Sequence, residues 1–284
     1  VSRPKQGGPL LLGLPCRAEG EEIMKNSRRQ FLKVASLSFL GFAAAKALPG
    51  AAMAAEQAES APAAYRSPKK ALKATHWGMV IDTRKFDDPA KFAAVVSACH
   101  RFHNVPKIDN ARNLKWIWTD GYRQTFTDQM DNYPAQAVLE RKYLLLCNHC
   151  VNPACVRVCP TKATFRRSDG IVVMDYHRCI GCRFCMAGCP YGARSFNFED
   201  PRPYIPETNP TFPTRMRGVV EKCTFCSERL AEGKMPLCVE ASQGAIVFGD
   251  LDAPNSDVRK LLAENFTIRR KPTLGTEPSV YYII

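Results

Sequence analysis

Twelve of the thirteen cysteines in this chain lie after residue 98, and eight of them fall within residues 147–189. The eight form two runs that each end in Cys-Pro. The second run is spaced C-x2-C-x2-C-x3-C, and the first has two extra residues before its third cysteine. In such a run three thiolates hold one 4Fe–4S cubane and the fourth crosses to the neighbouring cubane. The spacing predicts cluster one on Cys147, Cys150, Cys155 and Cys189, and cluster two on Cys179, Cys182, Cys185 and Cys159.

Two other uses of cysteine compete with this interpretation. Structural zinc sites take four ligands, commonly as two C-x2-C pairs, and disulfides are frequent in exported cysteine-rich chains. Neither use requires a repeated four-cysteine run that ends in Cys-Pro. The pattern therefore favours iron–sulfur clusters, with a zinc- or disulfide-built structural protein as the alternative.

A third set of cysteines, Cys223, Cys226 and Cys238, lacks a fourth member in its own segment. The run would close at Ser242, so a 3Fe–4S cluster or a hydroxyl ligand from Ser242 is one interpretation. The crossing rule offers another, because the lone Cys99 could be the fourth member of a lost run. The three earlier positions of that run hold no ligands: Pro89, Phe92 and Val95. We expect Cys99 to complete cluster three, so that twelve cysteines hold three 4Fe–4S clusters.

The formal charge of +13 at pH 7 would suit a nucleic-acid binder. Residues 1–54 hold 8 Lys and Arg against 3 Asp and Glu, which leaves 32 against 24 in residues 55–284. Each oxidised cubane with its four thiolates adds about two negative charges, so three clusters nearly cancel this surplus. We therefore expect counter-charges to the clusters rather than a nucleic-acid surface.

Several polar residues lie beside the cysteines. The arginines nearest the ligands could balance cluster charge or form a solvated face: Arg157, Arg178, Arg183 and Arg194. His149 and His177 also flank ligands, and they are either ordinary hydrogen-bonded histidines or residues that tune a cluster.

No C-x-x-C-H and no G-x-G-x-x-G occur, which argues against a free-standing redox enzyme with attached haem or a dinucleotide.

The first 54 residues resemble an export signal. Residues 1–23 are interpreted as an upstream extension before Met24, and residues 24–54 as a twin-arginine signal peptide around Arg28-Arg29. The apolar stretch at 34–45 is shorter than the roughly 20 residues that span a bilayer and suits a signal peptide. A chance Arg-Arg pair is the alternative. We expect a periplasmic protein, exported by the twin-arginine route and peripherally attached to a membrane complex.

From residue 76 to 284 the chain resembles the four-cluster, ferredoxin-like subunits of bacterial respiratory oxidoreductases, such as the dimethyl sulfoxide, tetrathionate, polysulfide and nitrite reductase systems. The resemblance is carried by both Cys-Pro runs and by these segments: W-G-M-V-I-D, H-N-V-P after Cys99, R-L-A-E-G-K-M-P-L-C, I-V-F-G-D-L-D-A-P-N-S and L-G-T-E-P-S-V-Y-Y. The departure is the lost fourth cluster. The lost fourth cluster and the export signal together make the chain most similar to DsrO-type subunits of the DsrMKJOP membrane complex in sulfur-metabolising prokaryotes.

The resemblance implies an electron-transfer subunit rather than an enzyme, with no small-molecule substrate of its own. It implies two partners: an integral membrane, quinone-interacting subunit of the NrfD type and a periplasmic multihaem cytochrome c. Another periplasmic reductase or hydrogenase system is the alternative.

The implied fold class is α+β, with two fused bacterial ferredoxin-like modules made of β-hairpins and cluster-binding loops. Residues 136–200 would form the two-cluster module, and residues 76–135 with 215–250 a split one-cluster module. The other segments are a flexible leader (55–75), a proline-rich surface connector (201–214) and a C-terminal tail (251–284) that wraps the surface or touches a partner. Sequence patterns predict these elements: strands at 76–82 and 245–248, a helix at 91–102, a hairpin at 164–175, and a strand region holding Trp116, Trp118 and Tyr122.

Overall fold

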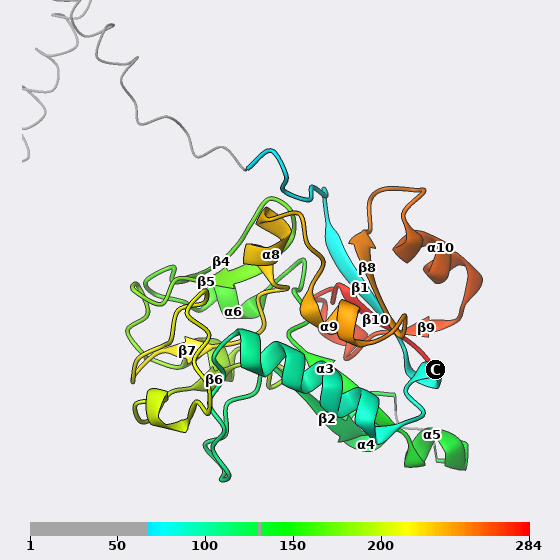
Figure 1. Cartoon of the computed structure of the whole chain (residues 1–284). Helices are drawn as coiled ribbons and strands as arrows, with labels where there is room; N and C mark the ends of the chain where they lie inside the picture. Colours follow the sequence, from blue (N-terminus) through cyan, green and yellow to red (C-terminus); the bar gives the residue numbers. More distant parts are fainter. Residues whose placement is uncertain (1–67, 130–131) are drawn as a thin grey trace, which may run out of the picture. The chain divides into compact units, whose positions relative to one another are not determined.

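The computed structural model describes residues 68–129 and 132–284, all within one unit that begins at residue 67 (Figure 1). The predicted upstream extension, the signal peptide and residues 55–67 of the leader lie outside the described residues. The described end of the leader is held in place, since the Leu72 N–H donates to the Leu230 carbonyl at 2.9 Å.

A four-stranded sheet joins the two ends of this unit in the order β8-β1-β10-β9. Strand β1 pairs in parallel with β10 and antiparallel with β8, and the short β9 pairs antiparallel with β10. All six residues of β1 are buried, which fits its apolar sequence and its place between two strands. The predicted strands at 76–82 and 245–248 are confirmed. The bounds are β1 (Trp77–Asp82), β8 (Ile246–Asp250), β9 (Thr267–Ile268) and β10 (Val280–Ile283).

The C-terminal tail corrects one expectation. It was expected to wrap the surface or touch a partner, but β10 is an inner strand of the sheet, and Val280, Tyr282 and Ile283 are buried. The sequence V-Y-Y-I is β-branched and aromatic, which suits a half-buried or buried strand. Helix α10 (Asp257–Glu264) packs against β8 and β1. The Ser256 side chain caps its first turn by accepting from the Arg259 N–H.

Helix α3 (Pro89–Phe102) confirms the predicted helix and begins two residues earlier. Asp88 caps its first turn by accepting from the Ala90 N–H at 2.7 Å, and Pro89 occupies a position where the missing N–H costs nothing. The buried residues of α3 are Phe92, Val95 and Cys99, which share one face at helical spacing. This helix packs along α9 (Leu237–Ala241).

Three small antiparallel sheets frame the cysteine segments: β2 (Ile117–Gly121) with β3 (Lys142–Leu146), β4 (Thr164–Arg166) with β5 (Val172–Met174), and β6 (Ser195–Phe196) with β7 (Val220–Glu221). The predicted hairpin at 164–175 is confirmed as β4–β5. Trp118 lies in β2 as predicted, whereas Trp116 precedes it and Tyr122 begins the next helix. Strands β6 and β7 join the segment after the second run to the segment before Cys223.

The remaining helices are short: α4 (Tyr122–Thr125), α5 (Gln136–Glu140), α6 (Ala154–Arg157), α7 (Phe184–Ala187), α8 (Ser227–Ala231), and the 3-10 turns η2 (Thr83–Lys85), η3 (Arg202–Tyr204) and η4 (Pro272–Leu274). The proline-rich connector is mostly exposed, but Phe212 is buried against His103 and Trp116. The expectation of a pure surface connector is therefore wrong at this aromatic anchor.

Candidate metal centres

The first group of cysteines gathers around the loop that follows β3. Cys147 is the first residue after that strand, Cys155 lies in α6, and Cys189 follows α7. Burial raises the pKa of Cys150 to about 12, and the charges of Cys147, Cys155 and Cys189 add to the rise. The structure therefore places Cys189, from the second run, with three cysteines of the first run.

The second group encloses a small cavity. Its lining includes Cys159 from the first run and three cysteines of the second run: Cys179, Cys182 and Cys185. Gly181 of this loop has φ +70°, and a Cβ there would collide with the Gly218 carbonyl. Only glycine fits at this close approach between the loop and the segment before β7.

The third group combines α3 with the segment from β7 to α9. Cys99 lies in α3, Cys238 in α9, and Cys223 and Cys226 in the loop before α8; all four are buried. Burial raises the pKa of Cys99 well above its ordinary value, and the charges of Cys226, Cys223 and Cys238 raise it further. The packing of α3 along α9 thus brings the lone upstream cysteine to the three downstream ones.

The hydroxyl group of Ser242 is not available as a metal ligand, because it already makes two hydrogen bonds. Its Oγ donates to the Val239 carbonyl at 2.7 Å and accepts from the Ile246 N–H at 3.0 Å. The non-cysteine positions of the expected run, Pro89, Phe92 and Val95, lie in helix α3, and Phe92 stacks on Phe86 with 4.6 Å between ring centroids. Aromatic packing therefore occupies the positions where a fourth cluster's ligands would begin.

The charges of individual cysteines act on one another across the three groups and give their order. The charge of Cys155, from group one, contributes to the raised pKa of Cys185 in group two, after burial and against the opposing Arg194. The charge of Cys147, also from group one, is the largest contribution after burial to the raised pKa of Cys223 in group three. Group one therefore lies between the other two.

The first C-x-x-C pair of each cysteine segment, at 147–150, 179–182 and 223–226, has one backbone conformation that suits an anionic cluster. The second residue between the cysteines is left-handed in each: His149 (φ 42°), Gly181 (φ 70°) and Phe225 (φ 54°). Left-handed residues in such turns point successive N–H groups into a concavity, a geometry found at iron–sulfur sites. Among the described residues, buried polar atoms without a hydrogen-bond partner include the side chains of Asn148 and Thr224 in these same loops. Thiols with raised pKa values need a metal to hold them as thiolates, so the residues fit bound clusters.

Two buried cations lie among the cysteines. Arg194 contacts Cys155 Sγ at 3.0 Å and donates to Thr164 Oγ1 at 2.7 Å. Burial alone would lower the pKa of Arg194, but the charges of Cys155 and other thiolates raise it overall. Lys222 is fully buried, and its Nζ donates to the Cys223 carbonyl at 2.7 Å and to the Val172 carbonyl. Lys222 was not recognised in the sequence, because its burial and its bond to Val172 depend on the fold.

The other candidate polar residues divide into two classes. Arg157, Arg178 and Arg183 are exposed, so they belong to a solvated face. His177 is also exposed and lies 3.6 Å from Asp175. His149 is buried and stacks on Phe225 with 3.6 Å between centroids. Burial lowers the pKa of His149 well below its usual value, with help from Lys222 and Arg194, so its ring is neutral and accepts from the Val172 N–H at Nδ1.

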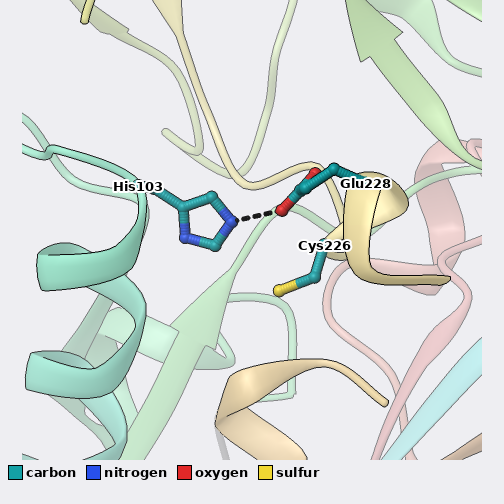
Figure 2. A group of neighbouring side chains, drawn as sticks. All are labelled: His103, Cys226 and Glu228. Atoms are coloured by element: carbon teal, nitrogen blue, oxygen red, sulfur yellow. Dashed lines mark hydrogen bonds and ion pairs between the residues drawn. The ribbon is translucent and has the colours of Figure 1, made fainter. Parts of the chain in front are cut away.

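His103 and Glu228 form a pair beside group three that was not recognised in the sequence (Figure 2). His103 Nδ1 lies 2.8 Å from the Cys99 carbonyl and 3.6 Å from Cys99 Sγ, and its Nε2 lies 2.8 Å from Glu228 Oε1. Cys226 Sγ is near enough to these groups to suggest a metal site. However, both ring nitrogens of His103 are already hydrogen-bonded to oxygen atoms. The pair therefore ties the end of α3 to the start of α8 and supports the loop of Cys226.

A buried ion pair supports the same region from the other side. Arg215 Nη2 lies 2.6 Å from Glu221 Oε2, and both side chains are almost completely buried. Glu221 also accepts from Trp116 Nε1 at 2.7 Å and from Asn197 Nδ2 at 2.6 Å. Because its carboxylate is fully partnered, this network fixes β7 directly before Cys223.

Comparison with known proteins places the chain in a family. Residues 143–202 match the 4Fe–4S dicluster domain family. The chain is 39% identical over 279 residues to the Hdr-like menaquinol oxidoreductase iron–sulfur subunit 1 of Archaeoglobus fulgidus, covering 90% of this chain and 97% of that protein. This protein belongs to the iron–sulfur electron-transfer subunits of respiratory oxidoreductase complexes.

Two further members of this family are similar over most of their length. The menaquinone reductase iron–sulfur cluster-binding subunit of Nitratidesulfovibrio vulgaris is 38% identical over 73% of this chain and 88% of its own. The B subunit of polysulfide reductase from Wolinella succinogenes is 34% identical over 66% of this chain and 84% of its own. Like the family, this protein binds 4Fe–4S clusters and transfers electrons rather than catalysing a reaction at a substrate. Across the described residues, no helix has the length and apolar character needed to cross a membrane.

Proposed function

We propose that the chain relays single electrons through three 4Fe–4S clusters, between a quinone-interacting membrane subunit of the NrfD type and a periplasmic multihaem cytochrome c. The observation that carries the relay is the order of the cysteine groups, in which the charge of Cys155 in group one acts on Cys185 of group two and the charge of Cys147 acts on Cys223 of group three. When bound, each cubane cycles between 2+ and 1+ and accepts or releases one electron.

The chain's own residues would set how easily electrons enter. Arg194 and Lys222 place buried positive charge beside the cysteines, and this favours the more negative, reduced state of a cluster. The left-handed C-x-x-C loops direct backbone N–H groups toward the same sites. The ligand assignment, including Cys99 for cluster three, is part of the proposal.

The partners and the location rest on similarity and on the sequence. Relatives named as a menaquinol oxidoreductase subunit and a menaquinone reductase subunit support exchange with a quinone-linked complex. The lost fourth cluster and the twin-arginine pattern at Arg28-Arg29 support a DsrO-type subunit of a DsrMKJOP complex in sulfur metabolism, attached at the periplasmic side of the membrane. Similarity to the B subunit of polysulfide reductase supports the second candidate, a subunit of another periplasmic reductase.

Purification of the native complex tests this proposal. About 12 irons per chain are expected if three cubanes are present. A co-purifying NrfD-type membrane subunit and a multihaem cytochrome c would support the DsrO-type assignment. A molybdenum-containing reductase in their place would support the second candidate. Zinc in place of iron would contradict both.

A further inference from the structure

Cluster two's cavity lies directly beneath an exposed apolar surface. Ile180 lines the cavity formed by the group-two cysteines, yet it is 67% exposed. Phe184, at the start of α7, is 59% exposed, and Val158, after α6, is also exposed. Gly188 follows α7, and a Cβ on it would sit 3.0 Å from the Val158 side chain, so Val158 packs against the end of the helix that begins with Phe184. We call Val158, Ile180 and Phe184, with Arg157 and Lys162, the cluster-two face.

Exposed positive charge predominates in the segment that carries this face. Residues 154–184 contain six Lys and Arg, all exposed, against two acidic residues. Both acidic residues already form ion pairs, Asp169 with Arg167 at 2.7 Å and Asp175 with Arg178 at 3.3 Å. The cations left over are Arg157, Lys162, Arg166 and Arg183.

Other segments of the chain pack against the other two cysteine groups. The segment before β10 closes over group one, because the Val151 and Asn152 N–H groups donate to the carbonyls of Glu277 and Thr276. All four cysteines of group three are buried. Three of the four cysteines are partly buried in group one and in group two alike, but the cavity of group two is lined by an exposed apolar side chain, that of Ile180, which makes group two the end of the relay that meets solvent.

We propose that the cluster-two face docks a redox protein whose own face has an apolar centre and an acidic rim. The cationic rim steers such a partner, and Ile180 and Phe184 exclude water at the contact. In the step, one electron passes to the partner, whose centre is reduced by one as the core held by Cys159, Cys179, Cys182 and Cys185 goes from 1+ to 2+. This inference rests on the proposed function and adds the site and chemistry of the partner.

Two one-electron oxidants of opposite charge test the electrostatic part. The reduced, cluster-loaded protein is mixed with ferricyanide or with hexaammineruthenium(III) at increasing salt, and cluster oxidation is followed by stopped-flow absorbance. The ferricyanide rate should fall with salt, and Arg157→Glu with Lys162→Glu should lower it several-fold at low salt and raise the ruthenium rate. The matched control, Arg259→Glu with Lys260→Glu on α10, makes the same change in net charge. Equal slowing by both pairs would show a net-charge effect and overturn the docking face.

Cross-linking in the native complex tests the partner. A photoreactive p-benzoylphenylalanine at position 184 should cross-link to a cofactor-carrying subunit, at a peptide rich in Asp and Glu. Cross-links to lipid alone, or to a subunit without a redox cofactor, would overturn the inference. If the docking inference fails, an iron content of about 12 per chain and unchanged cluster spectra would still support the proposed relay. Absence of iron from the unmodified protein would instead contradict the relay itself.

Discussion

Thr276 connects the C-terminal segment to the first cysteine group. A hydrogen bond from Thr276 lowers the pKa of Cys150 against the effect of burial, which puts the Thr276 side chain near that thiol. The Tyr191 and Thr276 hydroxyl groups are also hydrogen-bonded to each other. Hydrogen bonds to ligand sulfur stabilise the more negative state and raise a cluster's reduction potential. The L-G-T-E-P segment therefore acts on cluster one although it holds no ligand.

Thr276→Val should lower the reduction potential of cluster one. A net hydrogen bond is worth about 0.5–1.5 kcal/mol, and about 1.4 kcal/mol corresponds to 59 mV for one electron, so we expect a fall of about 20–60 mV. Redox titration followed by electron paramagnetic resonance measures the shift. Tyr191→Phe keeps the Thr276 hydroxyl group and should give a smaller fall. Unchanged potentials in both variants would show that this hydrogen bond does not tune the cluster.

Cys99→Ser should damage cluster three and leave the spectra of the other two clusters unchanged. The reason is that Cys99 is buried beside Cys226, Cys223 and Cys238, whose charges raise its pKa. The matched control is Ser242→Ala, which should preserve all three spectra, because the Ser242 hydroxyl is used by Val239 and Ile246. The reverse outcome would make Ser242 the ligand. Iron analysis and paramagnetic resonance of the reduced protein distinguish these cases.

Helix α3 combines a cysteine of group three with apolar side chains that pack into the core. Its N-terminal turn has a proline and an aspartate cap where a metal-binding loop would need cysteines, and its buried face keeps Cys99. Phe92 and Val95 replace ligands with apolar side chains that pack into the core. The helix therefore carries Cys99, the proposed fourth ligand of cluster three, while Phe92 and Val95 nearer its start contribute packing.

Phe92→Ala should destabilise the fold without changing the clusters. Truncating a buried phenylalanine costs about 3–5 kcal/mol, and this ring also loses its stack on Phe86. The thermal unfolding midpoint should fall clearly, whereas Phe266→Ala, at a side chain 82% exposed, should leave it nearly unchanged. Loss of cluster three in Phe92→Ala at low temperature would contradict the division of α3 into a packing part and a ligand part.

The sequence predicted the features of the whole molecule that depend on local spacing. The strands at 76–82 and 245–248, the α3 helix and the β4–β5 hairpin all follow from periodicity and turn residues. The C-terminal strand β10 and the buried Phe212 could not be recognised, because their burial depends on segments more than 90 residues away in the chain. Lys222 and His103 were missed for the same reason, since their roles arise from partners that only the fold brings near.

The order of the cysteine groups predicts how the whole molecule conducts. Cys150→Ala should remove cluster one and leave about 8 irons per chain. Clusters two and three should keep their own spectra at equilibrium, but electron exchange between them should become slow, because Cys155 and Cys147 of group one are the cysteines whose charges act on the two neighbouring groups. Rapid freeze-quench paramagnetic resonance after reduction would follow the two clusters separately. Cys226→Ala is the control, because it removes a terminal cluster and should leave exchange between clusters one and two fast. Equally fast exchange between clusters two and three in the Cys150 variant would mean that electrons do not pass through group one.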